Sequence, residues 1–323
     1  MSNLHRQADG VSEQRKAKAG EAIIGTTLQG IGPSYASKVN RFGLRMGDLL
    51  NWETFVPKYR KFVEDGQYHF HVDEFAIEEE LDQLRQLHEK VTKGNMIVDS
   101  VSYMHRALRD PKTRVIAEGA NACMLDVDFG TFPFVTSSNT TIGGVCTGLG
   151  VPPSAIETTI GIMKAYTTRV GGGPFPTHQD NEVGERLQQV GHEFGATTGR
   201  PRKCGWLDLN VVKFSNKING YSSINMTKLD VLSGLPQLEV ATHYELNGRR
   251  LDGEMPATLE DLAACKIVTQ TLPGWTEDIS NCSSKAELPR AAQDYIDFIE
   301  KDVGVPISWV GTGPEREAMF VNH

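Results

Sequence analysis

Residues 223–230 read Ser-Ile-Asn-Met-Thr-Lys-Leu-Asp, in which a short apolar strand pattern leads directly into a polar loop. Residues 305–310 repeat this design near the end of the sequence, and they lead into Gly311-Thr312-Gly313. In α/β folds, strands commonly present a binding site on the loops that follow them. The two stretches therefore predict an α/β fold with candidate binding loops at two strand ends.

Helical and strand patterns alternate over the rest of the chain. Apolar residues recur at helical spacing in three segments, 81–91, 183–194 and 289–299. Gly195 is placed to end the second of these helices. Short apolar runs predict strands at residues 96–98 and 114–117. The first nineteen residues are polar and could form one amphipathic helix, but it would have little to pack on.

The predicted fold is one α/β domain over residues 1–323, with a large, mostly parallel central sheet flanked by helices. Asn247-Gly248 is the strongest hairpin signal in the sequence, because both residue types readily adopt the positive φ angles of a tight turn. This dipeptide predicts a small β-hairpin subregion at residues 236–255 within that domain.

Composition and charge disfavour several classes of protein. The 323 residues carry 33 basic and 41 acidic side chains, a net charge of −8, which disfavours a protein that binds nucleic-acid backbones. No stretch approaches the ~20 apolar residues of a membrane helix, and the first ten residues lack the apolar core of a secretory signal. We therefore expect a cytoplasmic protein with no nucleic-acid or membrane partner.

Cysteine and histidine spacing gives no metal pattern. The five cysteines include no CxxC pair, which fits neither a zinc site nor a disulfide framework and suits a reducing compartment. His69 and His71 form an HxH pair at strand spacing, which is more often a polar strand face than a metal site. We therefore expect no metal ligands in this chain. The cysteines are Cys123, Cys146, Cys204, Cys265 and Cys282.

Two loops in the first half of the chain carry donors suited to anions or nucleobases. In residues 25–41, glycine amides, Thr hydroxyls and the cations Lys38 and Arg41, which share one face if the segment is helical, can bind phosphate. The alternative is a tight turn that caps an ordinary solvated helix. In residues 118–144, hydroxyl and amide side chains followed by two glycines can hold a phosphate or a base edge, or can form only a turn network.

Two loops in the second half are suited to carboxylates and to guanine. Residues 196–203 place three cations beside Thr and Gly, which suits a carboxylate clamp because Arg binds carboxylates bidentately; a solvated basic loop is the alternative. In residues 227–230, Asp230 can accept both the N1–H and the exocyclic amine of guanine while the Lys228 stem packs over the ring. Adenine offers no such donor pair, although most KxD sequences are surface charge pairs.

A phosphate-cradling motif is missing from this sequence. It contains neither GxxxxGK[ST] nor any Gly-Lys dipeptide. A guanine-reading loop is therefore present without the glycine-rich loop that would complete a nucleotide site.

In this order along the chain, the loops resemble those of the adenylosuccinate synthetase family, whose members join IMP and L-aspartate using GTP. The resemblance runs from about residue 24 to residue 316 and implies a fold similar to that of P-loop GTPases. It implies the ligase that forms adenylosuccinate at the first committed step from IMP to AMP, with Mg²⁺ as cofactor. The matching segments are GIGPSYASKVNR (30–41), EGANACMLDVDFGTFPFVTSSNTT (118–141), ATTGRPRKCGWLD (196–208), TKLD (227–230) and VGTGP (310–314).

The resemblance also implies roles for individual residues. Lys38 matches an active-site lysine, and Arg41 matches the arginine that reaches the IMP of the neighbouring subunit in a homodimer. Asn121 stands where many members have Gln. The implied IMP-binding residues are Thr27, Arg41, Asn121, Thr136 and Arg200. The implied aspartate-binding residues are Ala196, Thr197, Thr198, Gly199, Arg200, Pro201 and Arg202. The implied GTP-binding residues are Arg202, Lys228, Leu229, Asp230, Gly311, Thr312 and Gly313.

The implied reaction has two steps: GTP phosphorylates O6 of IMP, and the amino group of aspartate then displaces phosphate. In the family, an Asp in a GDEGKGK-type loop is the base and a His in a GHT segment is the acid, and neither segment occurs here. We therefore expect a chain shortened at its N-terminus, without the phosphate-loop strand, the base, the acid and the Mg²⁺ ligands. The alternative is a catalytically inactive fragment that binds IMP or GTP, or that pairs with full-length subunits.

Overall fold

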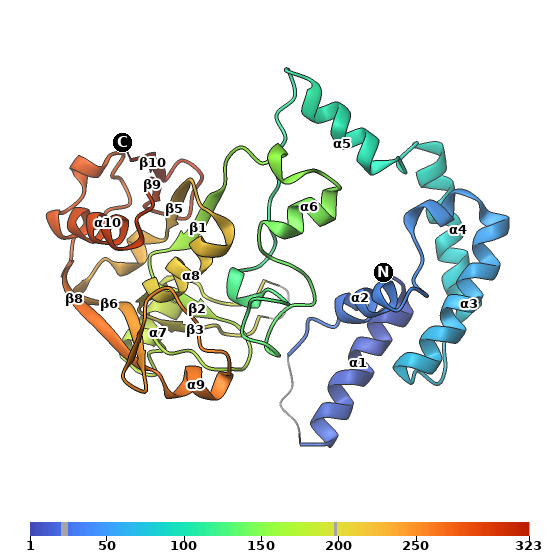
Figure 1. Cartoon of the computed structure of the whole chain (residues 1–323), viewed down its shortest axis with the longest axis horizontal. Coiled ribbons are helices and arrows are strands. Elements are labelled where there is room, and N and C mark those ends of the chain that lie inside the picture. Colours follow the sequence, from blue (N-terminus) through green and yellow to red (C-terminus); the bar gives the residue numbers. More distant parts are fainter. Residues whose placement is uncertain (21–24, 197–198, 323) are drawn as a thin grey trace. The chain divides into compact units, whose positions relative to one another are not determined.

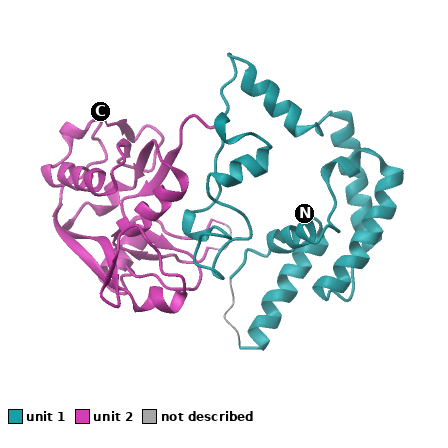
Figure 2. Cartoon of the chain, viewed as in Figure 1, with its two compact units in different colours: residues 1–155 teal, residues 156–323 magenta. Residues whose placement is uncertain are grey.

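Helices and strands divide unequally along the chain. The computed structural model describes residues 1–20, 25–196 and 199–322. The chain forms two compact units, residues 1–155 and 156–323, coloured teal and magenta in Figure 2. Every strand among the described residues belongs to the second unit, so the alternation of helices and strands predicted for the whole chain is found only there.

The first unit is helical (Figure 1). Its α-helices are α1 (Asn3–Lys18), α2 (Ile31–Val39), α3 (Trp52–Phe70), α4 (Ile77–Lys93), α5 (Ser100–Arg109) and α6 (Gly143–Leu149). Its 3₁₀ helices are η1 (Met46–Leu50), η2 (Cys123–Leu125) and η3 (Pro153–Ala155).

The N-terminal helix α1 packs into the core of this unit. Leu4 and Ala8 are buried in one cluster with Phe62 of α3 and Leu81 of α4. The packing is close, since a Cβ on Gly66 of α3 would lie 2.5 Å from Cδ2 of Leu4. The expectation that this helix would have little to pack on is therefore wrong: its apolar residues are few, but a spacing of four places them on one face.

Two segments predicted as strands in this unit do not form strands. Residues 96–98 and 114–117 lie where the described residues of the unit offer no strand to pair with, and Ile116 is 91% exposed. An apolar run becomes a strand only where a neighbour satisfies its backbone donors and acceptors. The predicted HxH strand is also wrong, because His69 lies in α3 and His71 ends that helix with a φ of 55°.

Replacing Gly30 with Ala should destabilise the junction of α1 and α2. Gly30 has a φ of +78°, and a Cβ there would lie 2.6 Å from the backbone carbon of His5. Its amide also donates to Oδ2 of Asp9 at 3.0 Å. Left-handed strain alone costs about 1–2 kcal/mol, and the overlap with backbone adds to it. Faster hydrogen exchange in α1 and α2 would report the loss.

A matched control separates strain from overlap in this junction. Gly20 has a φ of +71°, and a Cβ added there would meet none of the described atoms within 4 Å, so Gly20→Ala carries the left-handed strain alone. Equal effects of the two variants would contradict the overlap argument.

The second unit contains strands and helices in alternation. Its strands are β1 (Ile160–Lys164), β2 (Thr167–Arg169), β3 (Lys203–Gly205), β4 (Leu207–Asp208), β5 (Ser223–Thr227), β6 (Leu235–Leu246), β7 (Arg249–Leu251), β8 (Lys266–Trp275), β9 (Ile307–Gly311) and β10 (Met319–Val321). Its helices are α7 (Glu182–Val190), α8 (Leu209–Asn219), α9 (Leu259–Ala264) and α10 (Arg290–Val303), with 3₁₀ helices η4 (Leu229–Leu232) and η5 (Lys285–Glu287).

The first sheet has the order β1-β5-β9-β10, in which β1–β5 and β5–β9 are parallel and β9–β10 is antiparallel. Met226 of β5 pairs with Val310 of β9. Both strands predicted from the opening stretches are therefore present and adjacent. Because they run parallel, the loops that follow them lie at one edge of the sheet.

The other described strands form one sheet of mixed pairing and one antiparallel pair. Strand β6 pairs in parallel with β4 and antiparallel with β7 and β8, while β2 and β3 form an antiparallel pair. The prediction of one large, mostly parallel sheet is therefore wrong. The described strands form three separate sheets, and reversals of the chain such as the β6–β7 hairpin pair strands antiparallel. The hairpin itself is confirmed, and its turn residues Asn247 and Gly248 have φ angles of 51° and 78°.

Helix α7 ends four residues earlier than predicted. Its C-cap is Gly191 rather than Gly195, and His192 then adopts a φ of 49°. This break turns the chain so that the side chain of Glu193 is fully buried, while Phe194 remains 38% exposed. The apolar periodicity misplaced the end because Phe194 happens to continue the helical spacing without belonging to the helix.

Asp208 should make stability depend on pH between about 4 and 6. This buried carboxyl group caps α8 by accepting from Val211 N at 3.2 Å, and it also accepts from the Tyr244 hydroxyl. Burial raises the pKa of Asp208 to about 6 despite the hydroxyl donor. A raised pKa favours folding at low pH, and this contribution is lost as the pH rises through about 6.

Asp208→Asn tests this dependence, since Asn keeps an acceptor for the helix cap but does not ionise. Relative to the variant, the wild type should lose up to about 3 kcal/mol as the pH rises from 4 to 6. Urea unfolding midpoints across that range measure the difference, and parallel curves would show that Asp208 does not titrate there.

Candidate functional site

The loops after β5 and β9 lie together at one edge of the first sheet. Lys228 follows β5 with a φ of 62°, and Leu229 is fully buried beneath it. A Cβ on Gly311 would lie 3.5 Å from Cα of Thr227, so the two loops are in contact distance. Thr312 is 1% exposed and its amide donates to Ala318 O at 2.9 Å. The structure thus brings residues 227–230 and 311–313 together.

Asp230 contributes an acceptor to this edge. Its Oδ1 is shielded from solvent and accepts no hydrogen bond from any residue that the structure describes. Burial raises the pKa of Asp230, with the nearby Lys228 charge opposing the shift. An acceptor left without a donor at a loop is poised for a ligand that brings N–H groups, and the Watson–Crick edge of guanine supplies two.

The loop over residues 195–202 is closed at its base by backbone hydrogen bonds. Gly195 N donates to Arg200 O at 2.8 Å, and Arg202 N donates to Glu193 O at 2.9 Å. Phe194 and Pro201 form an isolated bridge beside them. Arg200 is exposed on this loop, as are its described neighbours Ala196, Gly199 and Pro201. The predicted aspartate-binding residues Thr197 and Thr198 lie outside the described residues.

The buried carboxylate of Glu193 connects this loop with the loop at residues 227–230. Lys164 Nζ lies 2.7 Å from Oε2, Arg202 Nη1 lies 2.8 Å from Oε2, and Lys228 Nζ lies 3.5 Å from Oε1. The Tyr166 hydroxyl donates to Oε1 at 2.6 Å. Although burial works in the opposite direction, hydrogen bonds led by Lys164 and Tyr166 lower the pKa of Glu193 to about 2.

Glu193 was not among the residues that the sequence predicts for the site. Its partner Lys164 is 29 positions away in the chain, so no local spacing marks the pair. The available signal was indirect: a charged residue directly after a helix end and between two glycines, Gly191 and Gly195.

In the first unit, Lys38 and Arg41 do not share a helix face. Lys38 is in the last turn of α2 with its Nζ 5.7 Å from the centre of the Tyr35 ring. Arg41 lies beyond the helix with a φ of 66°, so the prediction of a common face is wrong. Both side chains are exposed, as is that of Thr27 in the preceding loop.

Residues 118–144 contain a network of hydrogen-bonded turns, and some of their polar side chains are accessible to solvent. The carboxylate of Asp126 is fully buried and accepts from the amides of Thr140 at 2.6 Å and Thr141 at 3.2 Å. These amides are therefore already used, which supports the turn-network interpretation for that part. Asn121, with a φ of 69°, is exposed and Thr136 is half-buried. A Cβ on Gly32 would lie 3.1 Å from Oγ of Ser137, so this loop reaches the start of α2.

Neither a metal cluster nor a membrane helix is evident. Within residues 1–20, 25–196 and 199–322, no group of three or more His, Cys, Asp and Glu side chains is arranged to hold a metal ion. No helix in the described parts of the chain is both long and apolar enough to cross a membrane.

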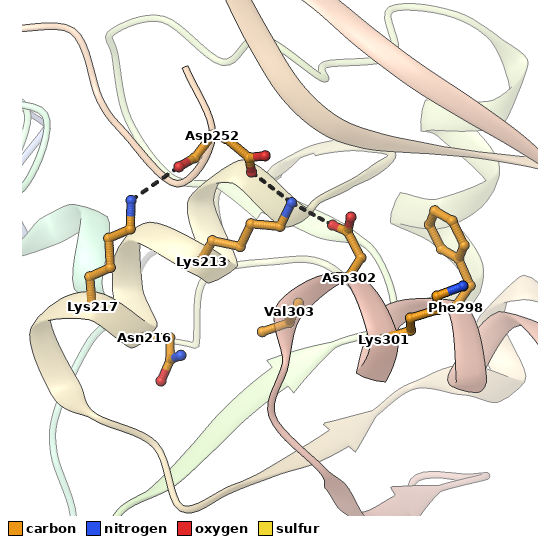
Figure 3. A pocket seen from close by; sticks show the side chains of 8 residues that line it. All are labelled: Lys213, Asn216, Lys217, Asp252, Phe298, Lys301, Asp302 and Val303. Atoms are coloured by element: carbon orange, nitrogen blue, oxygen red, sulfur yellow. Dashed lines mark hydrogen bonds and ion pairs between the residues drawn. The ribbon is translucent and has the colours of Figure 1, made fainter. Parts of the chain in front are cut away.

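A surface cavity of about 470 Å³ lies between α8 and α10, away from these loops in the sequence (Figure 3). Two of its three lysines are already paired: Lys213 with Asp252 at 2.8 Å and Asp302 at 2.7 Å, and Lys217 with the backbone oxygen of Gly253 at 2.7 Å. Its lining includes none of the described residues predicted for the site. We interpret it as an ion network that ties the 252–253 turn to the two helices.

Comparison with known proteins gives a consistent result. The family model for adenylosuccinate synthetase matches residues 1–320. The adenylosuccinate synthetase of Paramecium tetraurelia is 51% identical over 317 residues, which cover 98% of this chain and 72% of that protein. That of Schizosaccharomyces pombe is 50% identical over 319 residues, covering 99% of this chain and 72% of that protein.

The fold agrees with the same family. The structure of fully ligated adenylosuccinate synthetase from Plasmodium falciparum superposes with a TM-score of 0.95 at 42% identity, covering 99% of this chain and 76% of that one. These matches do not favour the alternative of an inactive binding fragment.

Proposed function

The chain belongs to the adenylosuccinate synthetase family, which joins IMP and L-aspartate with GTP in purine biosynthesis, and from this premise we propose how its loops divide the substrates. The loops after β5 and β9 bind the guanine of GTP, the loop over residues 195–202 binds L-aspartate, and the loops of the first unit bind IMP. The observation that carries this proposal is the shielded Oδ1 of Asp230, which has no donor among the described residues.

In the guanine site, Asp230 accepts the N1–H and the exocyclic amine, and the Lys228 stem covers the ring. Gly311 leaves room for the base because its position carries no Cβ, and Leu229, Thr312 and Gly313 complete the lining. We propose that β1, β5 and β9 form the guanine-binding part of a P-loop-GTPase-like fold, in which such a loop follows a parallel strand.

In the aspartate site, Arg200 binds the substrate carboxylates bidentately, helped by Thr197, Thr198 and the backbone of Ala196, Gly199 and Pro201. Arg202 stands between this site and the GTP site, since it closes the aspartate loop and also contacts the carboxylate that Lys228 contacts.

In the IMP site, we assign the hydroxyls of Thr27 and Thr136 and the amide of Asn121. Lys38 is the catalytic candidate, because an exposed ammonium can stabilise charge on a phosphoryl group in transfer to O6 of IMP. Arg41 is exposed beyond α2, which suits an arginine that reaches the IMP of a second subunit.

We further propose that the protein acts as a cytoplasmic homodimer, a location that its cysteine spacing without any CxxC pair suits. The family uses Mg²⁺ to neutralise phosphate charge. The described residues of this chain offer no matching group of carboxylate ligands for this ion.

Equilibrium binding to the purified chain tests the proposal, because binding does not require the GDEGKGK and GHT segments that this sequence lacks. We expect GDP to bind more tightly than ADP, because Asp230 finds no donor pair on adenine, and we expect L-aspartate to bind in the presence of IMP. Equal affinities for GDP and ADP, or no binding of L-aspartate, would contradict the assignment of the loops.

A further inference from the structure

The carboxylate of Asp126 joins two parts of the segment 118–144 that are about 14 residues apart in the chain. The side chain is fully buried, and its Oδ1 accepts from the amides of Asp128 at 2.9 Å and Phe129 at 3.1 Å. Its Oδ2 accepts from the amide of Thr140 at 2.6 Å and from both the amide and the hydroxyl of Thr141, at 3.2 and 3.3 Å. One side chain therefore binds the turn at 126–129 to the chain at 140–141.

The backbone on either side of Asp126 is paired with the residues that carry Thr136. Thr136 N donates to Leu125 O at 2.9 Å, and Val127 N donates to Ser138 O at 3.3 Å. The position of the Thr136 backbone is thus set by the two residues that flank Asp126.

Asn121 is connected to the same carboxylate through Thr140. Oδ2 of Asp126 holds the amide of Thr140, and the Thr140 hydroxyl in turn donates to Ala122 O at 2.9 Å. Ala122 directly follows Asn121, whose backbone has a φ of 69°. The exposed side chain of Asn121 therefore starts from a backbone that Asp126 fixes through one intermediate residue.

The site of Asp126 suits an ionised carboxylate and no other group. Burial disfavours its charge, but hydrogen bonds from amides such as those of Asp128 and Thr140 outweigh that effect and lower the pKa of Asp126. Asparagine has a single acceptor oxygen, so its NH₂ group would face one of the two pairs of amide donors and leave them without a partner.

We propose that Asp126 is a positioning residue for IMP binding, because it fixes the backbone that carries Asn121 and Thr136. Since it is fully buried, it acts through these two residues and does not touch the ligand. This inference rests on the proposed function, which takes Asn121 and Thr136 to be contacts of IMP.

Equilibrium titration of IMP and of GDP into the full chain tests the role of Asp126. In Asp126→Asn, the Kd of IMP should rise about tenfold, because donors that lose their acceptor shift the backbone at 121–122 and 136–138. The Kd of GDP should stay within about twofold, since the assigned guanine residues belong to the second unit. An unchanged Kd of IMP, or an equal rise for GDP, would overturn the proposal.

Thr131→Val is the matched control within the same segment. Thr131 is also buried, and its hydroxyl donates to Met124 O at 3.3 Å, but it makes no bond to the carboxylate of Asp126 among the described contacts. We expect this variant to lower the unfolding midpoint while the Kd of IMP stays within about twofold. A rise as large as that in Asp126→Asn would mean that any loosening of the segment weakens IMP binding.

A double-mutant cycle separates positioning from general stabilisation. In a chain that already carries Asn121→Ala and Thr136→Val, adding Asp126→Asn should change the Kd of IMP less than about twofold, because the residues through which it acts are gone. If the full tenfold effect persisted in that background, Asp126 would not act through Asn121 and Thr136, and the inference would fail.

Thr140→Val tests the same connection if Asp126→Asn does not fold. It removes the hydroxyl bond to Ala122 O and keeps the amide that Asp126 binds, so the Kd of IMP should rise about threefold; an unchanged value would contradict the connection to Asn121.

Failure of the proposed function would look different. If Asn121→Ala with Thr136→Val leaves the Kd of IMP unchanged, the assignment of the IMP site itself is wrong. If that pair weakens IMP binding but Asp126→Asn does not, only the role of Asp126 is overturned.

Discussion

Replacing Asp230 with Asn should weaken GDP binding about 100-fold, because the variant loses a charge-assisted acceptor for two guanine donors, worth about 3 kcal/mol. The carboxylate is half-buried with its Oδ1 shielded, so water cannot take over the contact. The affinity for IMP should stay within about twofold, since the assigned IMP contacts lie elsewhere in the chain. Calorimetric titration of both nucleotides measures the two effects separately.

Changing the base from guanine to xanthine gives a sharper test of the Asp230 assignment. Xanthine carries an oxygen where guanine carries its exocyclic amine, so the amide of Asn can donate to xanthosine diphosphate where the carboxylate repels it. We expect Asp230→Asn to prefer xanthosine diphosphate over GDP.

Asp278→Asn is the charge control, because Asp278 is an exposed neighbour whose charge acts on Asp230. Equal losses for GDP and IMP in Asp230→Asn, or the same preference in Asp278→Asn, would refute the guanine assignment.

The parts of the site that follow strands could be predicted from sequence. Residues 223–230 and 305–313 each contain a complete local signal, an apolar strand followed by a polar or glycine-containing loop. Parallel pairing of β5 with β9 then brings the loops together without further information. The Asn247-Gly248 hairpin is equally local, and it too is present.

Features that depend on a distant partner could not be predicted. Residues 114–117 have the composition of a strand, but a strand needs a neighbour, and none of the described residues of the first unit supplies one. Helix α1 has a weak apolar face, and only the fold shows that Phe62 covers it. Glu193 is the clearest case, because its importance comes from three cations at other positions.

Arg41 shows a related difficulty at short range. A spacing of three from Lys38 predicts a common helical face only if the helix continues, and α2 ends at Val39. Helix ends depend on capping and on tertiary packing as well as on periodicity. Near the end of a helix, spacing alone therefore does not predict which side chains share a face.

Replacing Arg200 with Leu should raise the Kd of L-aspartate, measured at saturating IMP, about 100-fold, because a bidentate arginine–carboxylate contact contributes two charge-assisted hydrogen bonds. Leu keeps much of the side-chain bulk while removing every donor. The loop itself should persist, since the contact that closes it uses the backbone oxygen of Arg200, which accepts from Gly195 N at 2.8 Å. GDP affinity measured without aspartate should therefore stay within about twofold.

Two further variants distinguish bidentate recognition from simple attraction. Arg200→Lys keeps the charge but not the planar pair of donors, so its Kd for L-aspartate should lie between those of the wild type and Arg200→Leu. Lys203→Met removes a nearby exposed cation and should change this Kd less than about threefold. A loss in Arg200→Leu that is confined to GDP affinity would show that the loop binds the nucleotide. Equal effects of Arg200→Leu and Lys203→Met would show that the loop attracts L-aspartate only through its general positive charge.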